Sequence, residues 1–150
     1  MRVFLNKLSI NGVKNIDKKI EILFSNRTIN SKNDFSSSNI KAIYGPNGSG
    51  KSGIMSAMYI YKRAIGDIDG ISDKMFASFI SEAINKSTKL LSIEVIFTML
   101  RNDRDRCFKH RIDFALEDES VSIIKEEVSI LKDRTIDSNF KNLIEIKDGE

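Results

Sequence analysis

The residue types that could do chemistry are concentrated in one short stretch, residues 45–52. Glycines at three of its positions free the backbone from side-chain clashes, so that successive N–H groups can turn toward an anion. In such a pattern the lysine reaches the β- and γ-phosphates of a nucleotide, and the final hydroxyl ligates Mg²⁺. The stretch reads Gly45-Pro46-Asn47-Gly48-Ser49-Gly50-Lys51-Ser52 and matches G-x-x-x-x-G-K-[ST] in full. It therefore predicts a nucleotide site, with Lys51 as the catalytic lysine and Ser52 on the metal.

Two flanking elements have to hold this stretch in place. Ile40–Tyr44 is a short β-prone run that ends at the first glycine. After Ser52, apolar residues recur at helical spacing from Ile54 to Ile65, and Gly66-Asp67 is a plausible end for that helix. The alternative is a glycine-rich turn that carries Lys-Ser by chance. Because motif, strand and helix occur in the required order, the site is the favoured interpretation.

The remaining elements follow from hydrophobic periodicity. Apolar residues in 4–10 and 20–24 predict two strands joined by a turn at 12–17, and the Ser- and Asn-rich residues 25–39 predict a surface loop. The spacing within Asp73–Ser87 predicts an amphipathic helix. A further strand is predicted at 143–147.

Residues 8–16 followed by 43–52 resemble the N-terminal lobe of SMC-like ABC ATPases, a group that includes RecF-like and OLD-like proteins and many bacterial anti-phage ATPases. Residues 91–97 and 108–116 are similar to the hairpin of that lobe. The resemblance implies an α/β P-loop NTPase fold, in which an antiparallel β portion accompanies the strand-loop-helix unit. It also implies that Lys14 approaches the bound nucleotide and that Asn47 lies near the γ-phosphate. A solvated turn lysine is the alternative for Lys14.

The function implied by the resemblance is that of an ATPase head in DNA repair or anti-phage defence. Such a head binds ATP and Mg²⁺, forms a homodimer around them and hydrolyses the ATP. Implied partners are DNA or another nucleic acid and an effector nuclease or toxin subunit. One alternative is a non-catalytic scaffold that senses nucleotide. Another is a transporter ATP-binding subunit, against which stands Ser52-Gly53, where transporters usually place Thr-Leu.

Several elements of the family are missing from these 150 residues. The chain has no glutamine, no apolar run that ends in Asp-Glu and no Ser-Gly-Gly signature. The resemblance assigns the last two to a C-terminal half, so residues 1–150 are expected to be the N-terminal part of one head, and a final strand running into Asp148-Gly149 supports that expectation. Glu94 and the pair Glu126-Glu127 are predicted to be exposed carboxylates and not substitutes for the missing catalytic acid.

Composition limits the other functions. With 41% hydrophobic and 30% charged residues the chain is globular, and its single cysteine and lack of a long apolar run predict a cytoplasmic protein without a membrane segment. A formal charge of +3 neither demands nor excludes nucleic acid. The basic stretch 101–106 is predicted to be a hairpin tip, either a phosphate-backbone grip or a solvated turn. His110 is predicted on the surface and Cys107 in a structural role.

Overall fold

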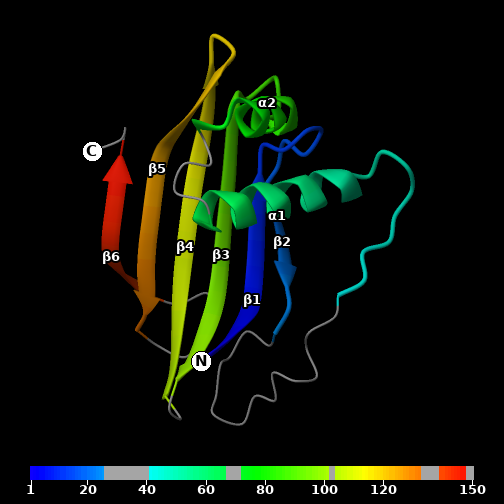
Figure 1. Ribbon diagram of the computed structural model, residues 1–150. Coiled ribbons are helices and arrows are strands. Elements are labelled where there is room, and N and C mark those ends of the chain that lie inside the picture. Colours follow the sequence, from blue (N-terminus) through cyan, green and yellow to red (C-terminus); the bar gives the residue numbers. More distant parts are fainter. Residues whose placement is uncertain (26–40, 67–71, 102–103, 133–138, 148–150) are drawn as a thin grey trace.

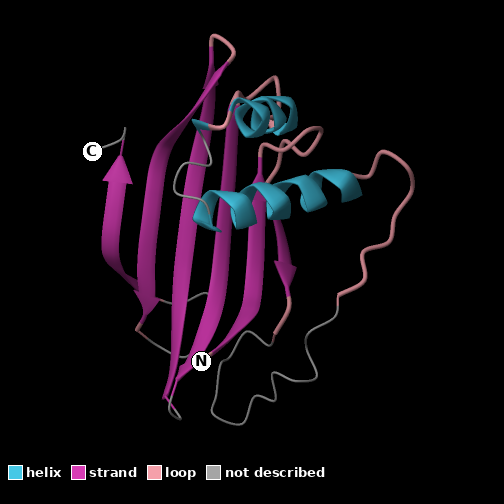
Figure 2. Cartoon of the chain, viewed as in Figure 1, coloured by secondary structure: helices cyan, strands magenta, loops and turns pink. Residues whose placement is uncertain are grey.

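The computed structural model describes residues 1–25, 41–66, 72–101, 104–132 and 139–147. Within these ranges the chain forms one sheet and two helices (Figure 1). The strands are β1 (Arg2–Asn11), β2 (Ile20–Leu23), β3 (Leu90–Arg101), β4 (Arg104–Glu117), β5 (Ser120–Leu131) and β6 (Phe140–Lys147). The helices are α1 (Lys51–Gly66) and α2 (Lys74–Ala83), and both lie on the same face of the sheet (Figure 2).

The sheet is antiparallel throughout, in the order β2-β1-β3-β4-β5-β6. Strands β3 to β6 form a meander in which each strand pairs with the next one in sequence. The β4–β5 turn places Asp118 and Glu119 at φ 45° and 68°, and the register sets Glu117 opposite Ser120. Two central residues with positive φ match the twist of the flanking strands, so this two-residue turn fixes the hairpin.

The core lies between the sheet and the helices. Side chains of β1, β3 and β4 alternate between the two faces, and most of the buried apolar ones point to the helices. Each such side chain contributes about 1.5–3 kcal/mol when it is fully buried. The buried set includes Leu8, Ile10, Leu91, Ile93, Ile112 and Phe114 from the sheet, Ile54, Ala57 and Ile60 from α1, and Phe76, Ile80 and Ala83 from α2.

Most predicted elements are confirmed. The strands at 4–10, 20–24, 91–97, 108–116 and 143–147 correspond to β1, β2, β3, β4 and β6, and the helix after Ser52 is α1. The helix predicted over Asp73–Ser87 is shorter and ends at Ala83. Asp73 caps it by accepting a hydrogen bond from the Met75 N–H at 2.9 Å. The loop predicted at 25–39 and the Asp148-Gly149 turn lie outside the described residues, apart from Ser25.

The predicted α/β P-loop NTPase fold is wrong. The described chain is mostly a six-stranded antiparallel sheet with two short helices. The physical reason is visible before α1, where residues 41–46 are irregular and exposed instead of forming the expected strand. A strand needs a partner for its backbone hydrogen bonds. The hairpins and meander supply partners to every strand of this sheet, and residues 41–46 are not among them.

No helix within the described ranges has both the length and the apolar character needed to cross a bilayer.

The face of the sheet opposite the helices carries polar and charged side chains, together with a small apolar cluster that contains Ile96 and Cys107. A row of directly paired residues crosses all six strands, and lysines on neighbouring positions form ion pairs with its carboxylates. The row consists of Glu21, Ser9, Glu94, Arg111, Glu127 and Glu145. Glu127 accepts hydrogen bonds from Lys109 at 3.0 Å, Lys125 at 3.2 Å and Ser129 at 2.8 Å. This charged face therefore holds the strands in register through side chains as well as backbone.

Acid should weaken the charged face through Glu127. Burial acts to raise the pKa of this carboxyl, but hydrogen bonds from Ser129, Lys109 and Lys125 outweigh it and lower the pKa from 4.5 to about 2. A lowered pKa stabilises the fold above pH 4.5, and that contribution is lost as the pH falls toward 2. Glu127→Gln should therefore cost about 1–3 kcal/mol of unfolding free energy at pH 7 and much less at pH 2.

Urea unfolding at the two pH values measures this difference. Glu117→Gln is the matched control, because Glu117 is exposed at the end of β4. A Glu127→Gln penalty that is the same at pH 7 and pH 2 would show that the loss comes from packing and not from the ion pairs.

Candidate phosphate-binding site

Residues 45–52, here called the glycine loop, lie at the amino end of α1, on a segment that stands out from the sheet (Figure 1). Gly48 and Gly50 have φ of 82° and 89°, conformations that residues with a side chain rarely adopt. The first intrahelical bond runs from the Ile54 N–H to the Gly50 carbonyl at 3.1 Å. The amides of residues 51–53 precede that bond, so the loop ends in N–H groups and the positive end of the helix dipole.

Lys51 bends back over the glycine loop. Its Nζ donates to the carbonyl oxygens of Gly45 and Pro46, both at 2.6 Å. An ammonium has three N–H donors, and the nearest further acceptor is Ser49 Oγ at 3.5 Å. All three donors of the ammonium therefore have an acceptor within the loop, and the bond to Ser49 is the longest and the easiest for an oxygen of an incoming anion to replace.

The other predicted loop residues are accessible. Gly45, Pro46, Asn47, Gly48 and Ser49 are all exposed, and Gly50 is buried beneath them. The loop is closed on itself by a bond from the Ser49 N–H to the Pro46 carbonyl at 3.3 Å.

Ser52, the predicted Mg²⁺ ligand, is exposed in the first turn of α1. Its carbonyl accepts a hydrogen bond from the Ser56 hydroxyl at 2.9 Å, so this contact uses the backbone of Ser52 and not its hydroxyl. Within the described ranges no group of three or more His, Cys, Asp or Glu side chains is placed to hold a metal ion. A metal here would therefore depend on the Ser52 hydroxyl, nucleotide oxygens and water.

The turn after β1 is brought against the glycine loop. Asn15 Nδ2 donates to the Gly48 carbonyl at 2.7 Å. Its neighbour Lys14 is exposed, has φ 50°, and donates its backbone N–H to the Ala83 carbonyl at 2.7 Å. The structure thus places the turn that carries Lys14 beside the loop, while the residue in contact is Asn15, which the sequence analysis did not single out.

The predicted strand before the loop is absent from residues 41–44, and Ile40 lies outside the described residues. Tyr44 is 91% exposed, so its ring has no packing that would fix a strand. The glycine loop is held instead by α1 behind it and by the 12–16 turn beside it. Of the predicted strand, loop and helix, the described residues therefore contain the loop and the helix but not the strand.

His110 is not the surface residue that was predicted. It is buried, with Nδ1 3.0 Å from Tyr61 Oη and Nε2 2.9 Å from Glu126 Oε1. Burial, and then the charge of Glu126, raises the pKa of Tyr61. The three side chains form a polar link between α1 and strands β4 and β5, so they tie the helix that carries Lys51 to the sheet.

The carboxylates predicted to be exposed are partly buried instead. Glu94 and Glu127 have side chains that are 18% and 13% exposed, because both belong to the charged face and pair with neighbours. Glu126 is bonded to His110, as described above.

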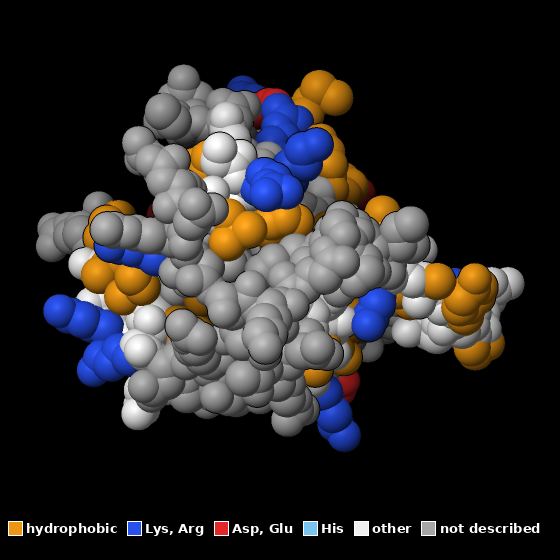
Figure 3. All heavy atoms as spheres, turned by 90° about the horizontal axis from the view of Figure 1, so that it is seen from below, with side chains coloured by type: hydrophobic (Ala, Val, Ile, Leu, Met, Phe, Trp, Pro, Cys, Tyr) orange, Lys and Arg blue, Asp and Glu red, His pale blue; other side chains and the backbone are white. Residues whose placement is uncertain are grey.

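Cys107 is buried beside Ile96 in a small apolar cluster, which fits its predicted structural role. The basic stretch 101–106 falls at the β3–β4 connection, as predicted, and its tip at 102–103 lies outside the described residues. On the face seen in Figure 3, the Lys and Arg side chains lie in separate groups around the rim.

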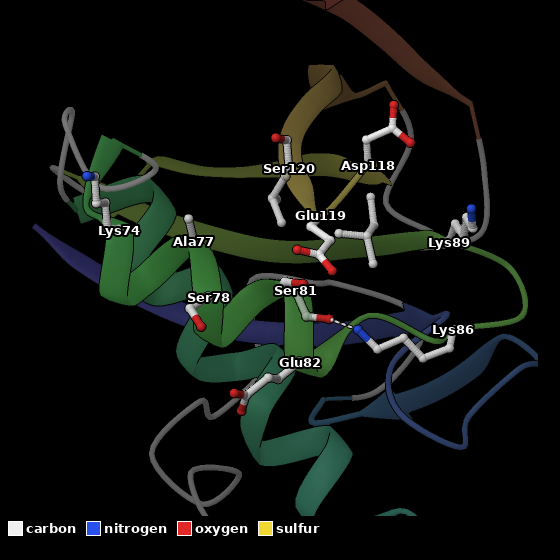
Figure 4. A pocket seen from close by; sticks show the side chains of 12 residues that line it. Lys74, Ala77, Ser78, Ser81, Glu82, Lys86, Lys89, Asp118, Glu119 and Ser120 are labelled. Atoms are coloured by element: carbon white, nitrogen blue, oxygen red, sulfur yellow. Dashed lines mark hydrogen bonds between the residues drawn. The ribbon is translucent and has the colours of Figure 1, made fainter.

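Two grooves lie away from the glycine loop. One, of about 770 Å³, runs between α2 and the β4–β5 turn (Figure 4). Its walls carry three lysines and three carboxylates, Lys74, Lys86, Lys89, Glu82, Asp118 and Glu119, so their charges balance and select no ligand of one sign. The other, of about 400 Å³, is apolar and lies between α1 and strands β1 and β3, with Met55, Tyr59 and Ile65 on its rim.

Comparison with protein-family models and with curated protein sequences finds no match for this chain.

Proposed function

We propose that the glycine loop binds the phosphates of ATP as its Mg²⁺ complex. The main support is the position of Lys51, whose ammonium is held over the loop by the Gly45 and Pro46 carbonyls at 2.6 Å. The positive φ of Gly48 and Gly50 and the amides at the start of α1 add donors directed at an anion. Ser52, exposed one residue later, supplies a hydroxyl for Mg²⁺.

Binding should depend on the number of phosphates. The donors of the loop and Lys51 are suited to β- and γ-phosphates, so ATP and ADP should bind at least about tenfold more tightly than AMP, which corresponds to roughly one charge-assisted hydrogen bond. Calorimetric titration of the chain with the three nucleotides in the presence of Mg²⁺ measures this. Equal affinity for AMP and ATP, or no binding of ATP, would refute the proposal.

Whether ATP is hydrolysed separates two functions. The resemblance to SMC-like ATPases favours a head that hydrolyses ATP as a homodimer, with DNA and an effector as further partners, and these partners stay predictions. The second candidate is a scaffold that binds nucleotide without turnover, and it is retained because the 150 residues contain no glutamine to link Mg²⁺ and the attacking water. Release of phosphate from ATP, followed together with the mass of the assembly, distinguishes them. Turnover in an ATP-dependent dimer supports the head, and binding without turnover supports the scaffold.

A further inference from the structure

The turn at residues 12–16 forms a floor for the glycine loop through two contacts. Asn15 Nδ2 donates to the Gly48 carbonyl at 2.7 Å. Ile16 lies directly under Gly50, where an added Cβ would come within 3.0 Å of its side chain. One contact is polar and the other is apolar, and both reach the part of the loop with positive φ.

The turn itself is rigidly held. The Gly12 N–H bonds to the Ile16 carbonyl at 3.0 Å, and the Ile16 N–H bonds to the Val13 carbonyl at 2.8 Å. Asn85, which follows α2 and is 7% exposed, donates its side-chain amide to the Lys14 carbonyl at 2.7 Å and its backbone N–H to the Gly12 carbonyl at 2.9 Å. Asn15 therefore lies on a turn whose backbone is fixed by hydrogen bonds within the turn and to the buried Asn85.

The hydrogen bond from Asn15 sets the direction of one peptide group. In a trans peptide the carbonyl oxygen and the next N–H point to opposite sides. With the Gly48 oxygen drawn toward Asn15, the Ser49 N–H points into the loop, where it meets the Pro46 carbonyl at 3.3 Å. Glycine permits this peptide to rotate at low cost, and the rotated form would aim an oxygen at a bound phosphate.

We propose that Asn15 is a positioning residue of the glycine loop, which keeps the Gly48 oxygen turned away from the phosphates of the nucleotide. The proposal rests on the proposed function, since it assigns Asn15 to the same site. Asn15 acts through the loop and touches no phosphate. Loss of the Asn15 side chain should therefore lower the affinity for every nucleotide that binds at the glycine loop by the same factor.

The test compares Asn15→Ala with the unaltered chain. Asn15→Ala loses one hydrogen bond, so its affinity for ATP and its affinity for ADP should both fall by about fivefold. This factor should be the same at low and at high salt concentration. Asn15→Asp should lower the affinity for both nucleotides further, because it places a negative charge beside the loop. This additional loss of affinity should be smaller at high salt, where the charge is screened. Asn11→Ala is the matched control, since Asn11 is exposed at the end of β1 opposite Ser92 and should bind as the unaltered chain does.

A second readout needs no nucleotide. NMR order parameters of the Gly48 and Ser49 amides should fall in Asn15→Ala and stay unchanged in Asn11→Ala. Unchanged order, or a loss of affinity for ATP alone, would overturn the proposal, because the latter indicates direct contact with the γ-phosphate. If the unaltered chain binds neither nucleotide, the proposed function and the nucleotide role of Asn15 both fail. Reduced order in Asn15→Ala would then still support the control of the Gly48 peptide.

Discussion

Replacement of Lys51 by methionine should weaken ATP binding by at least about 100-fold and leave the fold intact. A hydrogen bond from a charged donor contributes about 1.5–3 kcal/mol, and the ammonium also opposes the charge of the phosphates. Methionine keeps the length of the side chain and removes both effects. Lys51 is half-buried, and its bonds go to Gly45, Pro46 and Ser49 of the same loop, so the sheet and its core do not depend on it.

The matched control is Lys62→Met, which removes an exposed lysine farther along α1. Calorimetric titration with ATP should give the same affinity for this variant as for the unaltered chain, and thermal unfolding should give similar midpoints for all three. The loss in Lys51→Met should decrease at high salt, because its electrostatic part is screened. If both lysine variants bind ATP alike, phosphate does not bind at the glycine loop.

The part of the site that was predicted from sequence is the part encoded locally. The stretch at 45–52 contains three glycines, and two of them, Gly48 and Gly50, have the positive φ that favours glycine. The spacing of apolar residues also predicted α1 correctly, because a helix forms its backbone hydrogen bonds within its own segment and its pattern is therefore local too. The strand predicted at 40–44 was wrong over residues 41–44, since a strand depends on partners elsewhere in the chain and β propensity says nothing about them.

His110 shows how a local pattern was misinterpreted. Its charged neighbours Lys109 and Arg111 suggested a surface position, but successive residues of a strand point to opposite faces. Lys109 and Arg111 belong to the charged face, and His110 therefore shares the inner face with Ile112. Proper use of the alternation would have predicted burial.

Asn15 and Asn85 could not be identified from the sequence in this way. The bond from Asn15 to Gly48 joins residues that are distant in sequence, and it exists because the β1 turn and α1 meet on the same face of the sheet. Asn85 depends likewise on the end of α2 reaching Gly12 and Lys14. A single asparagine in a turn has many local roles, so its type carries no information about such a partner.

Replacement of Gly12 by alanine should have the largest effect on stability. Gly12 has φ 77°, and an added Cβ would lie 1.9 Å from the Leu90 carbonyl oxygen and 2.9 Å from its carbon. Both atoms belong to backbone at the start of β3, where Leu90 pairs with Ala115, so they cannot rotate away as a side chain could. Clash and backbone strain together should cost about 4 kcal/mol or more, a large share of the stability of a small domain. Urea unfolding, or loss of soluble protein, measures this cost.

Gly48→Ala separates the two causes. Gly48 has a similar φ of 82°, but an added Cβ there would meet nothing within 4 Å. Gly48→Ala should therefore lose only the free energy of unfolding that the strain of the positive φ costs, about 1 kcal/mol. The additional loss in Gly12→Ala measures the clash with Leu90. Equal losses in the two variants would mean that the start of β3 moves aside freely.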